Sequence, residues 1–132
     1  MERVVVMDKV RSEELHHLVE LMKLKSAVKS DYIAEFVDGI IRETYLRLRL
    51  LDVLSLPEIS LNTGESKPLE EVIKTLEDMC QRYEEHLAEI KKLRERAKTP
   101  LELEIIASLE KSLERSHITT RMLINALTES RG

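Results

Sequence analysis

The chain has 132 residues, 42% of them hydrophobic and 35% charged, with a formal net charge of −4. This length predicts a single domain, residues 1–132, whose core needs neither a disulfide nor a metal ion to fold. Three glycines and three prolines are too few for the frequent turns of a β-sandwich or barrel. The acidic balance argues against a nucleic-acid partner.

Cysteine usage and apolar runs narrow the class further. Cys80 has no second cysteine to pair with, which excludes an internal disulfide and a cysteine-based zinc site. The run Val4–Met7 is too short for a signal peptide or a membrane span, so we expect a cytoplasmic protein with no membrane partner. One glutamine beside abundant Glu, Lys and Arg is typical of thermophile proteins.

The N-terminal half of the chain is predicted to be an arm, residues 1–11, followed by helix over residues 12–56. The Val4–Val6 run within the arm is compatible with a strand, a helix extension or a tail. Two apolar stripes in residues 12–56 fit either one long helix or a pair of helices that breaks near Ser30. We favour one long helix, because no Gly or Pro supports a tight turn near Ser30.

The C-terminal half is predicted to be a loop, residues 57–67, and two helices, residues 68–98 and 99–130. Pro57, Asn62 and Gly64 are typical loop residues. Thr99-Pro100-Leu101-Glu102 is a capping box with Thr99 as N-cap. So short a connection predicts an antiparallel hairpin. The fold class is therefore all-α, an antiparallel bundle of three long helices, or four if the first breaks near Ser30.

Apolar residues at spacings of three and four run along both predicted C-terminal helices. Residues 68–98 place Tyr83 and His86 in this stripe. In residues 99–130, Ile105 and Ile124 widen a regular seam. That seam consists of Ile106, Leu109, Leu113, Ser116, Thr120, Leu123 and Leu127.

Leucines near the end of residues 12–56 point in nearly all directions around a helix. A helix that is apolar on several sides is buried on several sides, which in a small protein indicates an oligomer contact. The alternative is that two neighbouring helices of the same chain cover these leucines. We expect a homo-oligomer, or a different protein partner. The predicted oligomer interface is Tyr45, Leu46, Leu48, Leu50, Leu51 and Leu54.

One short motif suggests a metal site. Glu114-x-x-His117 resembles the helix motif of ferritin-like di-iron carboxylate proteins, which implies iron or manganese inside a four-helix bundle. His86 is the other candidate ligand, but Tyr83 stands where the second motif needs its Glu. The alternative, which we favour, is a solvated Glu114 and a surface His117, with no cofactor.

Polar residues also fall in the predicted interior: Cys80, Tyr83, His86, Ser116 and Thr120. They predict either a small-ligand pocket or a polar core layer that fixes the register of the two helices, and we favour the layer.

Two further patterns involve charged residues. Arg11 with His16 resembles the Arg-x4-His motif of HEPN-type helical ribonucleases, which implies RNA cleavage, but His16 and His17 also fit the polar face of a helix. The five cations within residues 91–98 fit either an anionic partner or the favourable end of a helix dipole.

These patterns together predict a non-enzymatic helical interaction or assembly module that self-associates around Tyr45 to Leu56. The alternative is a ferritin-like metal-binding or small-ligand enzyme with a site near His86 and His117.

Overall fold

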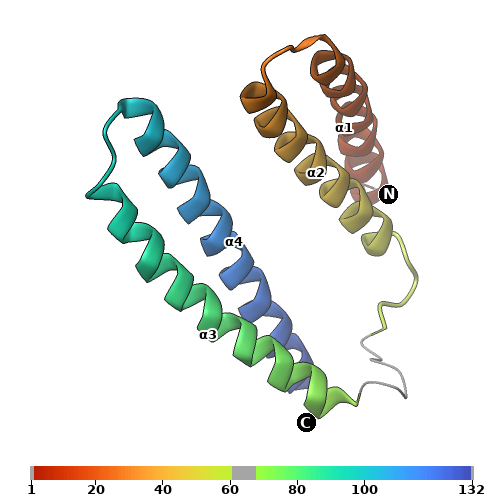
Figure 1. Cartoon of the computed structure of the whole chain (residues 1–132). Helices are drawn as coiled ribbons and strands as arrows, with labels where there is room; N and C mark the ends of the chain where they lie inside the picture. The colour runs from red at the N-terminus through yellow and green to blue at the C-terminus, as the bar shows by residue number, and fades with distance from the viewer. Residues whose placement is uncertain (1, 61–67, 132) are drawn as a thin grey trace. The chain divides into compact units, whose positions relative to one another are not determined.

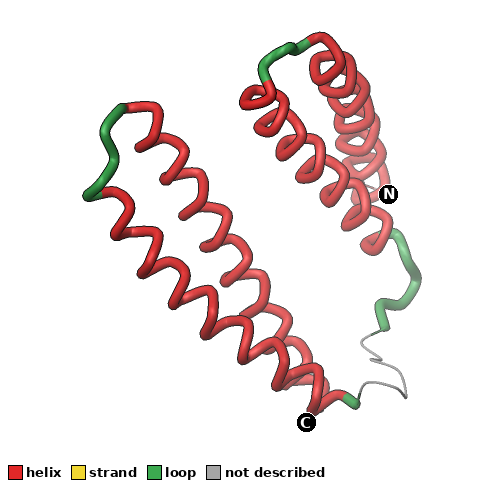
Figure 2. The backbone as a smooth tube through the Cα atoms, viewed as in Figure 1, coloured by secondary structure: helices red, strands yellow, loops and turns green. Residues whose placement is uncertain are grey.

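The computed structural model describes residues 2–60 and 68–131, and within them every regular element is a helix (Figure 2). The helices are α1 (Glu2–Ala27), α2 (Asp31–Leu54), α3 (Leu69–Arg94) and α4 (Pro100–Arg131). The all-α prediction is confirmed. The chain divides into two compact units, Met1–Ser60 and Leu61–Gly132, each built on a helical hairpin (Figure 1). A single domain over the whole chain stays a prediction.

The first predicted helix is broken, so the structure has four helices in its described residues rather than three. Val28–Ser30 separates α1 from α2, and the preference for one long helix was wrong. Ser30 adopts an extended backbone conformation, and its side chain accepts a hydrogen bond from the Ile33 N–H at 3.3 Å. This N-cap, followed by Asp31 in the first turn, begins α2 without any Gly or Pro.

The predicted N-terminal arm is also helical. Residues 2–11 form the first turns of α1, so the Val4–Val6 run is a helix extension. At the far end of the first unit, α2 ends at Leu54. Of the predicted loop over residues 57–67, the part from residue 61, with Asn62 and Gly64, lies outside the described residues.

Ion pairs set the register of α1 against α2. Arg11 pairs with Asp52, and the Arg47 guanidinium donates two hydrogen bonds to Glu14, at 2.8 and 3.1 Å. Nearer the turn, Lys25 Nζ lies 2.8 Å from Asp38 Oδ1. A pair whose residue on α1 lies farther from the turn also has its residue on α2 farther from the turn, as an antiparallel hairpin requires. Beside these pairs, α2 buries Val37, Thr44 and Leu48.

The predicted capping box begins α4. The Glu102 N–H donates to Thr99 Oγ1 at 3.1 Å, and the Glu102 carboxylate accepts from the Lys98 N–H at 2.6 Å. In a capping box this carboxylate accepts from the amide of the N-cap residue, which is Thr99; here it binds the Lys98 amide, one residue earlier. The connection from α3, residues 95–99, is short, and the predicted antiparallel hairpin is confirmed (Figure 1).

The core of the second unit lies along the contact between α3 and α4. Ile73, Cys80, Ile124 and Leu127 form its buried cluster. The predicted seam of α4 is wrong at Leu109 and Leu123, which are exposed, and it lacks Glu110, which is buried; Ile124, predicted to widen the seam, is buried. The residues of α4 that face α3 are Ile106, Glu110, Leu113, His117, Thr120, Ile124 and Leu127.

Candidate functional site

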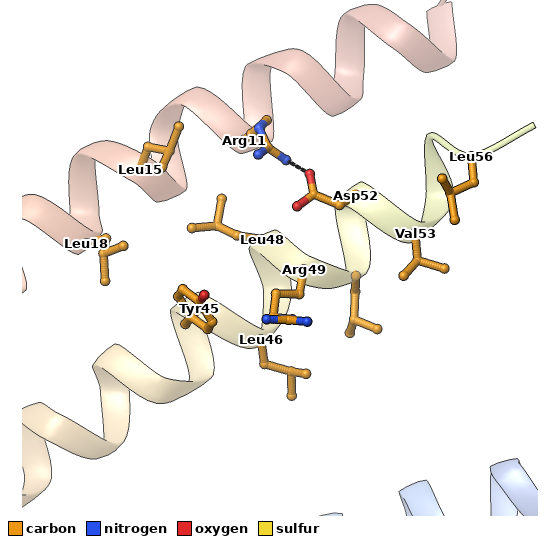
Figure 3. A pocket seen from close by; sticks show the side chains of 11 residues that line it. Arg11, Leu15, Leu18, Tyr45, Leu46, Leu48, Arg49, Asp52, Val53 and Leu56 are labelled. Carbon is orange, nitrogen blue, oxygen red and sulfur yellow. Dashed lines mark hydrogen bonds and ion pairs between the residues drawn. The ribbon is translucent and has the colours of Figure 1, made fainter.

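An open groove with a volume of about 710 Å³ lies between α1 and the C-terminal half of α2 (Figure 3). Leu15 and Leu18 of α1 face Leu48 of α2 across it. Apolar side chains dominate its lining. The lining residues are Arg11, Leu15, Leu18, Tyr45, Leu46, Leu48, Arg49, Leu50, Asp52, Val53 and Leu56.

The structure separates the predicted interface residues into two groups. Leu48 is only 6% exposed and Leu51 is half-buried, because both lie on the side of α2 that faces α1. Their contacts are therefore made largely within the hairpin, and their part in an interface between copies stays a prediction. The other group is exposed by 46–53% and is available to a partner: Tyr45, Leu46, Leu50 and Leu54.

Charged side chains stand at the edges of this groove. Arg11 and Asp52 form an ion pair that spans α1 and α2 at one end (Figure 3). The Arg49 guanidinium carbon lies 5.8 Å from the centre of the Tyr45 ring, in a cation–π contact. The groove is therefore an apolar strip with a polar rim, the composition typical of protein–protein interfaces.

Electrostatic shifts in the first unit arise at its interhelical ion pairs. The hydrogen bonds from Arg47 lower the pKa of Glu14 below its ordinary value, and they raise the pKa of Arg47. The hydrogen bond from Lys25, with the nearby charge of Arg42, lowers the pKa of Asp38. Both carboxylates are therefore held in their charged form in the folded hairpin.

We expect acid to weaken the first hairpin through Glu14. A carboxyl group with a lowered pKa in the folded state stabilises that state above its ordinary value of 4.5, and the stabilisation is lost as the pH falls through the folded pKa. Glu14→Gln should therefore destabilise the protein at neutral pH and reduce its loss of stability between about pH 5 and pH 3. Thermal unfolding followed by circular dichroism measures both effects. Glu13→Gln, an exposed neighbour, is the control; equal acid sensitivity in the two variants would contradict the prediction.

The predicted metal ligands do not converge. His86 and Glu114 are exposed, and His117 Nε2 lies 3.1 Å from Glu84 Oε1, a residue outside the motif. Within residues 2–60 and 68–131, no three side chains of His, Cys, Asp or Glu are grouped to hold a metal ion. The geometry thus gives the ferritin-like resemblance no support beyond the four residues of its motif.

The predicted interior polar set is only partly interior. Cys80 and Thr120 are buried and Tyr83 and Ser116 half-buried, but His86 is exposed, so its placement inside the bundle was wrong. The Thr120 hydroxyl donates to the Ser116 carbonyl at 2.6 Å within its own helix. The Cys80 thiol lies 3.9 Å from the His117 carbonyl oxygen. These contacts fit a polar layer between α3 and α4.

The remaining charged patterns are dispersed. Arg11 is engaged by Asp52, while His16 and His17 are exposed, so the three do not form a shared phosphate site. In the basic run, Lys92 pairs with Glu89 and Arg94 with Glu110.

Sequence reasoning missed the interhelical ion pairs, Glu14–Arg47 above all. The signal that identifies them is position: once the turn is placed at residues 28–30, Glu14 and Arg47 are nearly equidistant from it along the chain. Opposite charges at matching distances from a hairpin turn are then expected to meet.

Comparisons add no relative from which a function can be transferred. No helix in the described part of the chain is long and apolar enough to cross a membrane. No family model, curated protein or solved structure matches this chain.

Proposed function

We propose that this chain is a helical interaction module that self-associates through the groove of the α1/α2 hairpin. The observation that carries the proposal is the groove itself: an open, leucine-lined hollow of about 710 Å³ whose lining residues Tyr45, Leu46 and Leu50 are exposed. Exposed apolar surface that is continuous and rimmed by polar groups is typical of association sites.

The packing of α1 supports an occupant for this groove. Across its 26 residues α1 has no buried side chain, although it carries apolar residues along its length. Leu15, Val19 and Met22 are all exposed, and Leu15 lines the groove. A helix whose apolar side chains stay in water gains little from the hydrophobic effect, so a second surface against it would stabilise the hairpin.

A second copy of the chain fits the polar rim as well as the apolar floor. The rim offers both signs of charge, since Asp52 lies beside Arg11 and Arg49 precedes Asp52 on α2. A surface with both signs can pair with its own copy, with Arg49 of one copy facing Asp52 of the other.

Leu46→Glu tests the proposal. Leu46 is 50% exposed in the groove, and placing a carboxylate against an apolar partner surface should weaken self-association at least about tenfold. Sedimentation equilibrium over a range of protein concentrations measures the change. Circular dichroism should show the same helicity as the parent, because the substitution lies outside the contact between α1 and α2.

The matched control is Ile118→Glu. Ile118 is an aliphatic residue of α4 with 58% exposure and does not line the groove, so its substitution should leave self-association unchanged. A parent protein that is monomeric at millimolar concentration, or equal association of the two variants, would refute self-association through the groove.

A further inference from the structure

The two sides of the α3/α4 hairpin differ in chemistry. Successive residues of a helix are 100° apart, so the residue before each α3 residue that faces α4 lies on one side of the hairpin and the residue after it on the other. In an antiparallel pair, a 180° rotation about an axis normal to the plane of the two helices places each helix on the other and keeps the two sides of the pair unchanged. On α4 too, therefore, the residue before each residue that faces α3 lies on the same side as the preceding residues of α3. The side formed by the preceding residues, called the flank here, consists of Val72, Thr75, Met79, Arg82, His86, Glu89 and Leu93 of α3 and Ile105, Leu109, Ser112, Ser116, Thr119 and Leu123 of α4.

The opposite side is strongly charged. It carries Glu70, Lys74, Glu77, Gln81, Glu84, Lys91, Lys111, Glu114 and Arg121, and it also exposes Ile118. The flank instead exposes large apolar side chains, among them Met79, Leu93, Leu109 and Leu123. The flank is therefore the side of this hairpin that gains from leaving water.

The order of residues along the flank is symmetric. On α3, His86 is the centre: Arg82 and then Met79 lie in one direction, and Glu89 and then Leu93 lie in the other. Met79 thus has Leu93 as an apolar counterpart at the same distance from His86, and the cation Arg82 has the carboxylate Glu89 as its counterpart within one residue of the matching position.

The flank of α4 has the same symmetry at its centre and at its ends, whereas Leu109 between them has the polar Thr119 as its counterpart. Ser112 and Ser116 lie at its centre, and Ile105 and Leu123 lie at equal distances on either side. The small serines leave room for a close approach of another helix, whereas the larger residues project beyond them at the ends.

The two centres lie at the same level of the hairpin. Glu84 contacts His117, and Arg94 contacts Glu110. His86, just after Glu84, therefore lies beside residues 112–116 of α4. A single two-fold axis that lies in the plane of the flank and crosses both helices can pass through both centres at once.

We propose that the flank binds the same flank of a second copy of this chain about that two-fold axis. In this arrangement Arg82 faces Glu89 of the second copy, and the reciprocal pair forms on the other side of the axis. Met79 lies against Leu93 of the second copy in the same way, and α4 packs against its counterpart at the serines.

The flank is large enough for a stable dimer. α3 has 26 residues, so it is about 39 Å long, and two packed helices present a side about 20 Å wide. Each copy can then cover roughly 800 Å², the area per partner that is typical of specific interfaces. This surface is separate from the α1/α2 groove and does not rest on the function proposed above.

Charge exchange between copies tests the two-fold pairing. Arg82 and Glu89 are seven residues apart, about 10 Å along one helix, so any strong coupling between them must arise between copies. In the full chain carrying Leu46→Glu, which weakens the groove, we expect Arg82→Glu and Glu89→Arg each to weaken self-association about tenfold, because like charges then face each other twice. An equimolar mixture of the two variants should associate as tightly as the parent, since every facing pair is again opposite in charge.

Sedimentation equilibrium of each variant and of the mixture measures these effects. Arg121→Glu, a charge reversal on the opposite side of α4, is the control and should change nothing. The proposal is overturned if the single variants associate like the parent, if the mixture associates no better than either variant, or if the Leu46→Glu parent is monomeric at millimolar concentration. If the proposal for the groove is wrong, Leu46→Glu will instead leave the self-association of the wild-type protein unchanged.

Discussion

Replacing Ile124 by alanine is expected to lower the free energy of unfolding by about 2–4 kcal/mol. Ile124 is 7% exposed and belongs to the buried cluster with Ile73, Cys80 and Leu127. The cost combines the lost transfer of a buried side chain from water with the cavity that the smaller residue leaves. The effect is large because two helices alone supply this core, so few neighbouring side chains can move to fill the gap.

Ile118→Ala is the matched control on the same helix. Ile118 is 58% exposed, so its truncation should change the free energy of unfolding by less than about 0.5 kcal/mol. Chemical denaturation followed by circular dichroism compares the two variants. Similar losses in both would show that α4 does not pack through the side that contains Ile124.

The rotation of α4 about its own axis, which decides the side that faces α3, explains why the sequence identified only part of its packing. Positions 106, 113, 120 and 127 were predicted correctly, whereas Leu109 and Leu123 were expected in the seam and are exposed. Leu109 is more hydrophobic than Glu110, so a pattern based on hydrophobicity selects the leucine; Leu123 and Ile124 are both apolar, and the pattern included both. The structure instead turns Glu110 toward α3, where Arg94 pairs with it, and leaves both leucines exposed on the flank.

The break between α1 and α2 was visible in the sequence as a capping signal. Ser30 and Asp31 are favourable residues for starting a helix, and the absence of Gly and Pro weighed too heavily against them. A three-residue connection can be closed by an N-cap and by interhelical ion pairs such as Lys25–Asp38. Contacts between the two helices decide which side of each helix faces the other. The hydrophobic pattern of a single helix does not contain this information.

The candidate groove was half predicted for the same reason. The leucine-rich end of α2 pointed to Tyr45, Leu46, Leu50 and Leu54, which are exposed, and the first three of them line the groove. Which leucines α1 covers depends on the side of α2 that Arg11 and Glu14 engage through their ion pairs. That information lies in the pairing of charges across the hairpin rather than in the spacing of leucines.

Replacing Arg94 by methionine should lower the free energy of unfolding by about 3 kcal/mol, because it leaves the carboxylate of Glu110 without its cation. Glu110 is only 5% exposed, and it accepts a hydrogen bond from Arg94 Nε. Lys92→Met, which removes the well-exposed pair with Glu89, should cost less than about 0.5 kcal/mol and serves as the control.

The double variant Arg94→Met with Glu110→Leu should recover most of the stability lost by Arg94→Met. A leucine at position 110 continues the apolar contact between Ile106 and Leu113, and no buried charge remains without a partner. Chemical denaturation of the parent, both single variants and the double variant gives the coupling free energy between the two sites. An Arg94→Met variant as stable as Lys92→Met, or additive losses in the double variant, would show that Glu110 does not depend on Arg94. The carboxylate would then be solvated rather than part of the contact between α3 and α4, and the register inferred for the flank would lose one of its two fixed points.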